Sequence, residues 1–214
     1  MPRAIHRPAN PNGHGLAVTH GAGANANAPL LVAVAEAFCA AGYTVLRFSL
    51  PFREKRPFGP PSPSGAAEDR AGIRAACAQV RTAVPGKLIL AGHSYGGRQS
   101  SMLLAEDPAV ADALLPLSYP LHPPNKPEKS RTEHLPNLRT PTIFVHGTKD
   151  GFGSIAEIES ARKLIPAPVR LHIVDGAGHD LALGNFNLAP VIAEFDSYFA
   201  GAGFGGASAT ASVI

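Results

Sequence analysis

The stretch LAGHSYGGR, from Leu90 to Arg98, places Ser94 between two glycines directly after the apolar run KLIL. The apolar run predicts a buried strand, and the residues that follow, SYGGRQSSMLLAED (94–107), have the pattern of a helix. A Gly-x-Ser-x-Gly sequence between a strand and a helix is typical of a nucleophile elbow, a sharp turn that exposes the serine side chain. The alternative is that Ser94 is the N-cap of an ordinary helix after a glycine-rich bend.

Short apolar runs alternate with helical patterns along the chain. Six segments have the pattern of strands: 15–21, 43–50, 86–92, 113–120, 140–147 and 168–176. Helical patterns occupy five others: 28–42, 64–84, 94–107, 154–165 and 189–200. This alternation predicts an α/β fold with one mostly parallel sheet of about six strands and helices on both faces. We expect a single domain over residues 1–200 and a flexible Gly/Ala/Ser-rich tail over residues 201–214.

The composition argues against several classes of protein. The chain has 214 residues, a formal net charge of +3 and 16% charged residues, which is too small a basic surplus to indicate nucleic-acid binding. No stretch approaches the ~18 consecutive apolar residues of a membrane helix. The N-terminal segment MPRAIHRPANPNGHG lacks the apolar region of a secretory signal. We therefore expect a soluble, cytoplasmic protein without membrane or nucleic-acid partners.

A nucleophilic serine needs a base, and the base needs an acid that orients it. In the chain order of α/β-hydrolases, the acid follows a later strand and the histidine follows the last strand. The segment TIFVHGTKD places Asp150 at the first position, and IVDGAGHDL places His179 at the second. We predict a catalytic triad of Ser94, Asp150 and His179. Asp175 and Asp180, which flank the histidine, are alternative acids.

An oxyanion hole is the remaining part of such a site. We expect one donor to be the backbone N–H of Tyr95, directly after the nucleophile. The second is expected from the glycine-rich loop THGAGANAN (19–27) after the first strand, where the N–H groups of Ala22 and Gly23 are the candidates.

The sequence predicts no cofactor. Four histidines lie at predicted strand ends, His20, His93, His146 and His179, but none forms a close His-x-x-x-His or His-x-Glu pair of metal ligands. We expect His93 and His146 to pack behind the site and to bond to the backbone. The phosphate-binding loop motif is absent, and the loop after the first strand lacks the third glycine of a dinucleotide fingerprint. Cys39 and Cys77 fall in helical patterns and are expected to be small buried hydrophobes.

Two proline-rich segments, 51–64 and 120–141, each leave the carboxyl end of a predicted strand, the edge where open α/β sheets bind ligands. Both carry an excess of positive charge, which predicts an electropositive mouth that favours anionic esters. The alternative is that these charges only solvate exposed loops. Residues predicted to contact the substrate are His20, Arg53, His122, Lys126 and Arg131. With no long helical insertion after Tyr119, we expect no lid and a preference for short-chain esters.

Several blocks of sequence together resemble a known family. They are THGAGAN, LRFSLPFRE, GHSYGGR, LSYPLHPPNKPEKSRTEHL, FVHGTKDGFG and GAGHDL. The chain, from about Gly15 to Phe199, is similar to small α/β-hydrolases related to dienelactone hydrolases. Eukaryotic relatives in that group include a histone-acetyltransferase-complex subunit and a testis-expressed protein. The resemblance implies a compact core without a cap domain. It also implies Ser94, Asp150 and His179 as nucleophile, acid and base.

The resemblance does not carry a dienelactone substrate to this chain, because dienelactone hydrolase is similar to proteins with a cysteine nucleophile and this chain has Ser94. The leading expectation is a serine hydrolase that cleaves small carboxylic esters or thioesters through an acyl-enzyme. A serine-dependent acyltransferase shares that intermediate. The alternative from another class is a non-catalytic scaffold of the same fold, in which the loop from His122 to Leu135 binds a partner.

Overall fold

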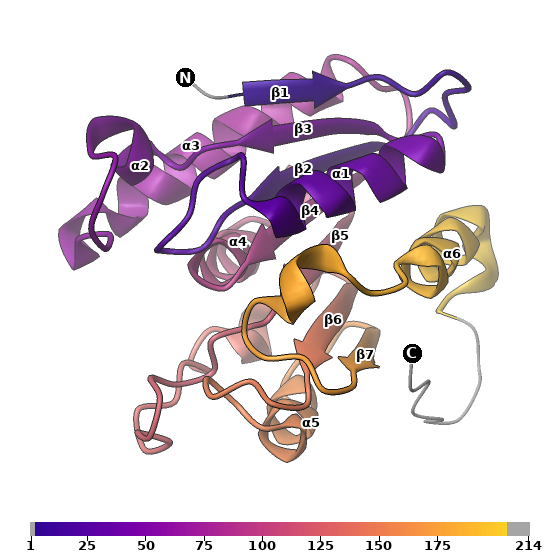
Figure 1. Cartoon of the computed structure of the whole chain (residues 1–214). Coiled ribbons are helices and arrows are strands. Elements are labelled where there is room, and N and C mark those ends of the chain that lie inside the picture. Colours follow the sequence, from indigo (N-terminus) through magenta and orange to yellow (C-terminus); the bar gives the residue numbers. More distant parts are fainter. Residues whose placement is uncertain (1–2, 205–214) are drawn as a thin grey trace.

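A computed structural model describes residues 3–204 (Figure 1). One sheet of seven strands runs through the molecule in the order β1-β3-β2-β4-β5-β6-β7. All neighbouring strands are parallel except the pair β1 and β3. The strands are β1 (Arg3–His6), β2 (Gly15–Thr19), β3 (Thr44–Phe48), β4 (Leu88–His93), β5 (Ala113–Leu117), β6 (Thr142–Gly147) and β7 (Val169–Val174). All six predicted strands are present.

The seventh strand, β1, corrects the expected count of about six. It pairs antiparallel with the edge of β3, with Arg3 opposite Phe48 and His6 opposite Val45. Its four residues alternate between exposed and half-buried, because only one face of this edge strand covers the core. It therefore has no apolar run of the kind that marks a buried strand, and its charged side chains are typical of a protected edge.

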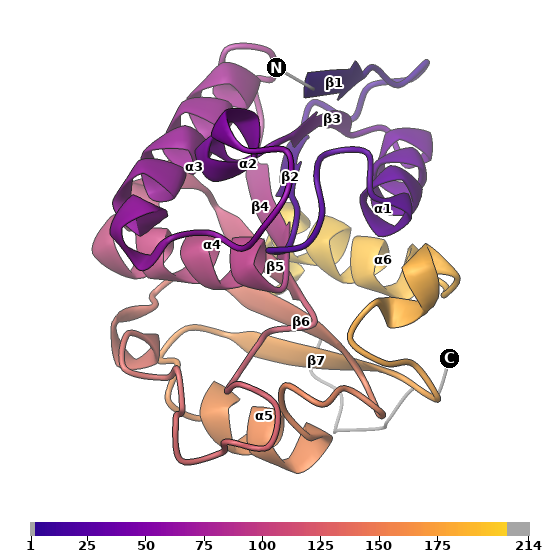
Figure 2. The same ribbon diagram turned by 60° about the vertical axis from the view of Figure 1, so that its left-hand side comes forward.

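Helices cover both faces of the sheet (Figure 2). They are α1 (Pro29–Ala40), α2 (Pro51–Lys55), α3 (Ala66–Arg81), α4 (Tyr95–Glu106), α5 (Ile155–Arg162) and α6 (Ala189–Ser197). Buried residues of α3, α4 and α5 pack on one face and those of α1 and α6 on the other. Residues of β2 alternate between the two layers, since Leu16 and Val18 face α1 while Ala17 faces the opposite core. The predicted α/β architecture is thus confirmed.

The first proline-rich segment contains a helix that the sequence analysis did not predict. It begins with the short helix α2, in which Pro51 occupies the first turn, where its missing N–H is not needed. Short turns of 3₁₀-helix lie at Pro63–Gly65, Pro108–Val110, Leu135–Asn137 and Leu181–Gly184, and a π-helical turn lies at Tyr198–Ala202.

Two further expectations concern the ends of the domain and the cysteines. Phe204, within the predicted tail, stacks on Tyr198 with ring centroids 4.6 Å apart. Residues 205–214 of that tail lie outside the described residues. Cys39 and Cys77 are free thiols, and Cys77 is buried in the core while Cys39 is half-buried.

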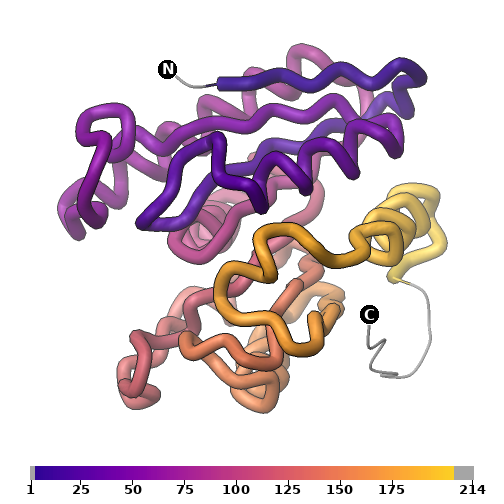
Figure 3. The backbone as a smooth tube through the Cα atoms, viewed as in Figure 1, coloured from indigo at the N-terminus to yellow at the C-terminus, as the bar shows by residue number. Residues whose placement is uncertain are grey.

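The segment between β5 and β6 contains no cap domain. Within residues 118–141 the only helical element is the 3₁₀ turn Leu135–Asn137, which is too short to form a lid. Figure 3 shows this segment and the connection from β3 to α3 at the same side of the molecule, where the parallel strands end. No helix in the described part of the chain is long and apolar enough to cross a membrane.

Candidate active site

Ser94 lies at a strained turn between β4 and α4. Its backbone has φ +50° and ψ −117°, a conformation that side-chain-bearing residues rarely adopt. The flanking glycines permit the turn, because a Cβ on Gly92 would lie 2.5 Å from the carbonyl carbon of Gly96, and one on Gly96 would lie 2.5 Å from the carbonyl oxygen of His20. The Ser94 side chain makes no capping hydrogen bond to α4. The alternative of an ordinary N-cap is therefore wrong, and the turn has the geometry of an elbow.

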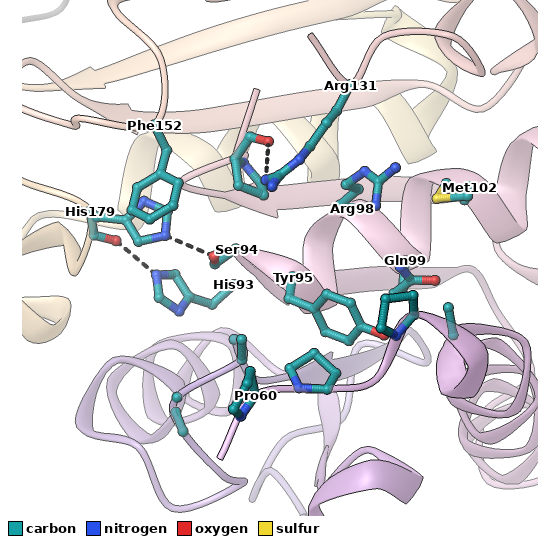
Figure 4. Close-up of a pocket in the computed structure, with 18 of the residues that line it drawn as sticks. Pro60, His93, Ser94, Tyr95, Arg98, Gln99, Met102, Arg131, Phe152 and His179 are labelled. Carbon is teal, nitrogen blue, oxygen red and sulfur yellow. Dashed lines mark hydrogen bonds between the residues drawn. The ribbon is translucent and has the colours of Figure 1, made fainter. Parts of the chain in front are cut away.

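A continuous chain of hydrogen bonds runs from Ser94 to Asp150 (Figure 4). Ser94 Oγ lies 2.7 Å from His179 Nε2. The other ring nitrogen, Nδ1, lies 3.0 and 2.9 Å from the two carboxylate oxygens of Asp150. With the proton on Nδ1, His179 donates to the carboxylate and accepts from the serine hydroxyl. The three side chains come from three strand ends and meet as the sequence predicts.

The two alternative acids are engaged elsewhere. Asp175 accepts a hydrogen bond from the hydroxyl of Thr148 at 3.2 Å. Asp180 accepts one from the N–H of Ala182 at 3.1 Å. Of the three aspartates considered, Asp150 is the one whose side chain contacts the imidazole of His179.

Asp150 is buried, and its environment favours the carboxylate. Burial opposes ionisation, but the hydrogen bonds from His179 and from the backbone N–H of Phe152 outweigh it and lower the pKa of Asp150. The Phe152 ring stacks on His179 with centroids 4.1 Å apart. An ionised acid and a stacked ring together hold the imidazole in one orientation.

Two other histidines support this arrangement through hydrogen bonds to the backbone. His93 Nε2 lies 2.8 Å from the backbone oxygen of His179, and His146 Nε2 lies 2.8 Å from that of Gly153. Burial lowers the pKa of both His93 and His146, which keeps them neutral. The expected bonds to backbone are confirmed for both, and His146 is fully buried as expected, but His93 lines the pocket beside Ser94 instead of packing behind it. Among residues 3–204, no group of three or more His, Cys, Asp or Glu side chains could hold a metal ion.

The loop between β2 and α1 lies beside Ser94. Gly21, Ala22 and Gly23 line the same pocket as Ser94 and Tyr95. The side chain of Arg53 holds this loop from outside, since its Nη2 donates to the carbonyl of Ala22 at 2.5 Å and its Nε to that of Ala24 at 2.9 Å. Because these carbonyls point toward Arg53, the loop is fixed with its backbone beside the serine.

The predicted substrate contacts divide into one residue in the pocket and four outside its lining. Arg131 lines the pocket. Arg53 is 8% exposed, and its guanidinium donates hydrogen bonds to four backbone carbonyls. It therefore positions the loop between β2 and α1 and does not contact the substrate. Lys126 is exposed on its loop and does not line the pocket. Its charge is therefore that of a solvated loop.

His20 and His122 also depart from the expectation. His20 is fully buried; its Nδ1 bonds to the carbonyl of Gly21 at 2.8 Å and its Nε2 accepts from the N–H of Leu50 at 3.0 Å. It ties the glycine-rich loop to the end of β3 and cannot reach a substrate. His122 lines a separate hollow of about 430 Å³, where its Nε2 lies 3.3 Å from Glu157.

The pocket at Ser94 has a volume of about 810 Å³ (Figure 4). Its walls include residues that the sequence analysis did not single out: Arg98, Gln99 and Met102 of α4, Pro60–Pro63 and Phe152. Helical spacing could have found the first three, because Arg98 and Gln99 lie four and three positions before Met102 and so share one face of the helix that the elbow begins. The prolines belong to the segment 51–64 that the sequence analysis placed at the ligand-binding edge, although it did not single them out one by one.

Comparison with known proteins agrees with this geometry. A family model described as the alpha/beta hydrolase domain matches residues 13–186. The chain belongs to this α/β-hydrolase family. Its fold resembles that of XC6422 from Xanthomonas campestris, described as an α/β serine hydrolase without a lid, with a TM-score of 0.68 at 18% identity over 91% of this chain and 85% of the other. The α/β-hydrolase fold and the lack of a cap domain are thus as predicted.

Dienelactone hydrolase from Anabaena variabilis is a second structural neighbour of this α/β-hydrolase, with a TM-score of 0.66 at 21% identity over 92% of this chain and 89% of the other. The predicted kinship with dienelactone hydrolases is supported at the level of the fold, while the eukaryotic relatives stay a prediction. A curated protein, polyketide synthase ThaQ from Burkholderia thailandensis, is 42% identical over 79 residues, or 36% of this chain. The match spans only 4% of the length of ThaQ.

Proposed function

We propose that this α/β-hydrolase is a serine hydrolase that cleaves small carboxylic esters or thioesters through an acyl-enzyme. The observation that carries the proposal is the unbroken hydrogen-bond chain from Ser94 through His179 to Asp150, at a strained turn that opens into a pocket. Backbone strain of this kind costs folding free energy and is found mainly at functional sites. A strained residue whose reactive side chain faces a pocket therefore favours a catalytic role.

In the proposed mechanism, Ser94 Oγ attacks the carbonyl carbon while His179 Nε2 takes the hydroxyl proton. The tetrahedral intermediate collapses, and the departing alkoxide or thiolate takes that proton from His179. A water molecule, deprotonated by His179, then attacks the acyl-enzyme, releases the acid and restores Ser94. Asp150 holds the imidazole with Nδ1 protonated and stabilises the imidazolium that forms in each half-reaction.

The oxyanion of the intermediate is proposed to accept hydrogen bonds from the N–H of Tyr95 and from that of Ala22 or Gly23. Tyr95 is the first residue of α4, so its N–H has no partner within the helix. The N-terminus of this helix also favours negative charge. Tyr95 itself is held in place, because its hydroxyl donates to the buried carboxylate of Asp69 at 2.8 Å. Losing one oxyanion donor in comparable sites costs about 10²- to 10³-fold in kcat.

The substrate class follows from the size and openness of the pocket. A volume of about 810 Å³ suits a small molecule. The connection from β5 to β6 provides no helical cover that would bury a long acyl chain. We expect activity on acetyl and butyryl esters that falls as the acyl chain lengthens; a steep rise toward long chains would overturn this preference. A cytoplasmic location likewise stays a prediction from the sequence.

Labelling with a fluorophosphonate probe tests the proposed nucleophile. Such a probe phosphonylates a serine only when a base activates it. We expect the folded wild type to be labelled and to hydrolyse 4-nitrophenyl acetate, and Ser94→Ala to do neither. Ser101→Ala, which changes a buried serine of α4 outside the pocket lining, is the matched control and should still be labelled. An unlabelled, inactive wild type would instead favour the non-catalytic scaffold.

A further inference from the structure

The pocket has a second polar end, formed by Arg98 and Arg131. Both residues line the cavity that contains Ser94. In Figure 4, Arg98 lies on the far side of Ser94 from His179, and the Arg131 side chain reaches toward the same region from the loop above. Arg98 is one helical turn beyond Ser94, which corresponds to a rise of about 6 Å along α4. The two ends of the pocket are therefore within the span of one small molecule.

Neither guanidinium has an acidic partner. No carboxylate of the described residues lies within 4.0 Å of them, whereas the nearby Arg70 is paired with Glu106 at 3.4 Å. Nε of Arg98 is buried without any hydrogen-bond partner. Both side chains lie on the same side of the pocket in Figure 4, and burial, together with the charge of Arg98, lowers the pKa of Arg131. Two unpaired, partly desolvated cations side by side are unfavourable unless an anion binds between them.

Arg131 is also held ready for a ligand. Its backbone N–H donates to Leu121 at 2.9 Å, its carbonyl accepts from the hydroxyl of Tyr119 at 2.8 Å, and its Nη1 donates to Pro120 at 3.1 Å. Within residues 3–204, the remaining donors of the side chain have no hydrogen-bond acceptor. A guanidinium fixed in this way matches the planar geometry of an anionic oxygen group and loses little entropy on binding.

We propose that Arg98 and Arg131 bind an anionic oxygen group of the substrate while Ser94 attacks its ester or thioester carbonyl. The proposal deepens the proposed hydrolase function and rests on it. It assigns the substrate class as small esters with a carboxylate or phosphate a few bonds from the scissile carbonyl. Of the two residues, Arg131 belongs to the second proline-rich segment, whereas Arg98 lies on α4 outside both segments.

The test compares matched anionic and neutral esters. One pair is a 4-nitrophenyl monoester of a dicarboxylic acid and its methyl-capped form, in a series of increasing spacer length; it places the anion on the acyl side. A second pair, 3-acetoxy-4-nitrobenzoate and its methyl ester, places the anion on the alcohol side. For each pair the ratio of kcat/KM, anionic over neutral, measures discrimination by the pocket.

We expect the wild type to prefer the anionic member of at least one pair. Arg98→Gln and Arg131→Gln should each lower the ratio by about 10- to 100-fold, the range for a lost hydrogen bond to a charged group. Arg98→Lys should restore part of it. Lys129→Gln removes one charge from an exposed position on the same segment as Arg131 and should leave the ratio within about twofold. Ratios unchanged by both glutamine variants would overturn the proposal.

A direct binding measurement separates this proposal from the proposed hydrolase function. Calorimetric titration of Ser94→Ala with glutarate, and separately with inorganic phosphate, requires no turnover. Binding of either anion that is lost in Ser94→Ala/Arg98→Gln supports the anion site and identifies which anion it prefers. No binding of either anion, together with ester hydrolysis that ignores charge, would refute the site while leaving the hydrolase intact. Binding without any hydrolysis or probe labelling would instead refute the hydrolase.

Discussion

The two ends of the pocket use polar side chains in opposite ways. At the His179 end, the side chains of the triad and of the loop anchor are hydrogen-bonded to protein groups: Ser94 bonds to His179, His179 to Asp150, and Arg53 to the carbonyls of the glycine-rich loop. At the other end, Arg98 and Arg131 have N–H donors that bond to no acceptor among the described residues. Fully satisfied groups fix a geometry, whereas unsatisfied charged groups are available to a ligand. Damage to the first end should therefore affect every substrate, and changes at the second end only charged ones.

The largest expected effect comes from Asp150→Asn. An amide cannot hold His179 with Nδ1 protonated, so kcat should fall by about 10⁴-fold for anionic and neutral esters alike. Asp175→Asn, a matched change at the rejected candidate, should alter kcat by less than about twofold, because Asp175 contacts the Thr148 hydroxyl instead. Steady-state rates on 4-nitrophenyl acetate measure both. A larger loss of kcat in Asp175→Asn than in Asp150→Asn would show that Asp150 is not the acid of the triad.

Arg53→Met should have the next largest effect. The change keeps the apolar stem but removes donors to the carbonyls of Ala22, Ala24 and Gly59, which frees the loop that carries the proposed oxyanion donors. We expect kcat to fall by about 100-fold, the scale of one lost oxyanion donor, with little change in KM. Lys55→Met is the control, since Lys55 forms only an exposed ion pair with Glu68. Equal rates for both variants would show that the loop needs no anchor.

His20 provides a test that depends on pH rather than on turnover. Burial lowers its pKa to about 4, and its neutral Nε2 accepts the Leu50 N–H. The unfolded chain binds the proton near pH 6.5 and the folded one only near pH 4. The stability due to neutral His20 is therefore complete above pH 6.5 and is lost as the pH falls toward 4. Relative to His20→Gln, urea unfolding should show a loss of about 3 kcal/mol over this range. A difference in unfolding free energy between wild type and His20→Gln that stays constant from pH 6.5 to pH 4 would contradict this prediction.

The smallest expected effect is that of salt. Raising the ionic strength to about 0.5 M should lower kcat/KM for the preferred anionic ester by a fewfold and leave its neutral partner unchanged, because salt screens attraction to the exposed part of the site. Stopped-flow or steady-state rates at several salt concentrations measure this. An identical response of the two esters would show that the arginine end does not act on the substrate.

Much of this fold could be predicted from the sequence, because buried parallel strands have continuous apolar runs. The edge strand β1 could not, since Arg3 and His6 are partly solvated and its pairing depends on a partner 39 or more positions away. The helix α2 could not be predicted for a similar reason, because its single proline and its charged residues are equally typical of a loop.

The candidate site follows the same division. Ser94, Asp150 and His179 could be placed because each stands at a strand end in a fixed chain order. Arg53 and Arg131 look alike in sequence, both being arginines in proline-rich segments. Only the hydrogen bonds separate them, since Arg53 is bound to backbone carbonyls and Arg131 keeps free donors. Hydrogen bonds between residues distant in the chain depend on the whole fold, so a local sequence pattern cannot predict them.

The most direct test of the central claim is to trap the acyl-enzyme. Rapid acid quench during turnover of 4-nitrophenyl butyrate, followed by peptide mass spectrometry, detects the covalent intermediate and its position. The account predicts a butyryl adduct on Ser94, formed with a burst of 4-nitrophenol equal to the enzyme concentration when deacylation is the slower step. Hydrolysis without an adduct on Ser94, or an adduct on another residue, would contradict it.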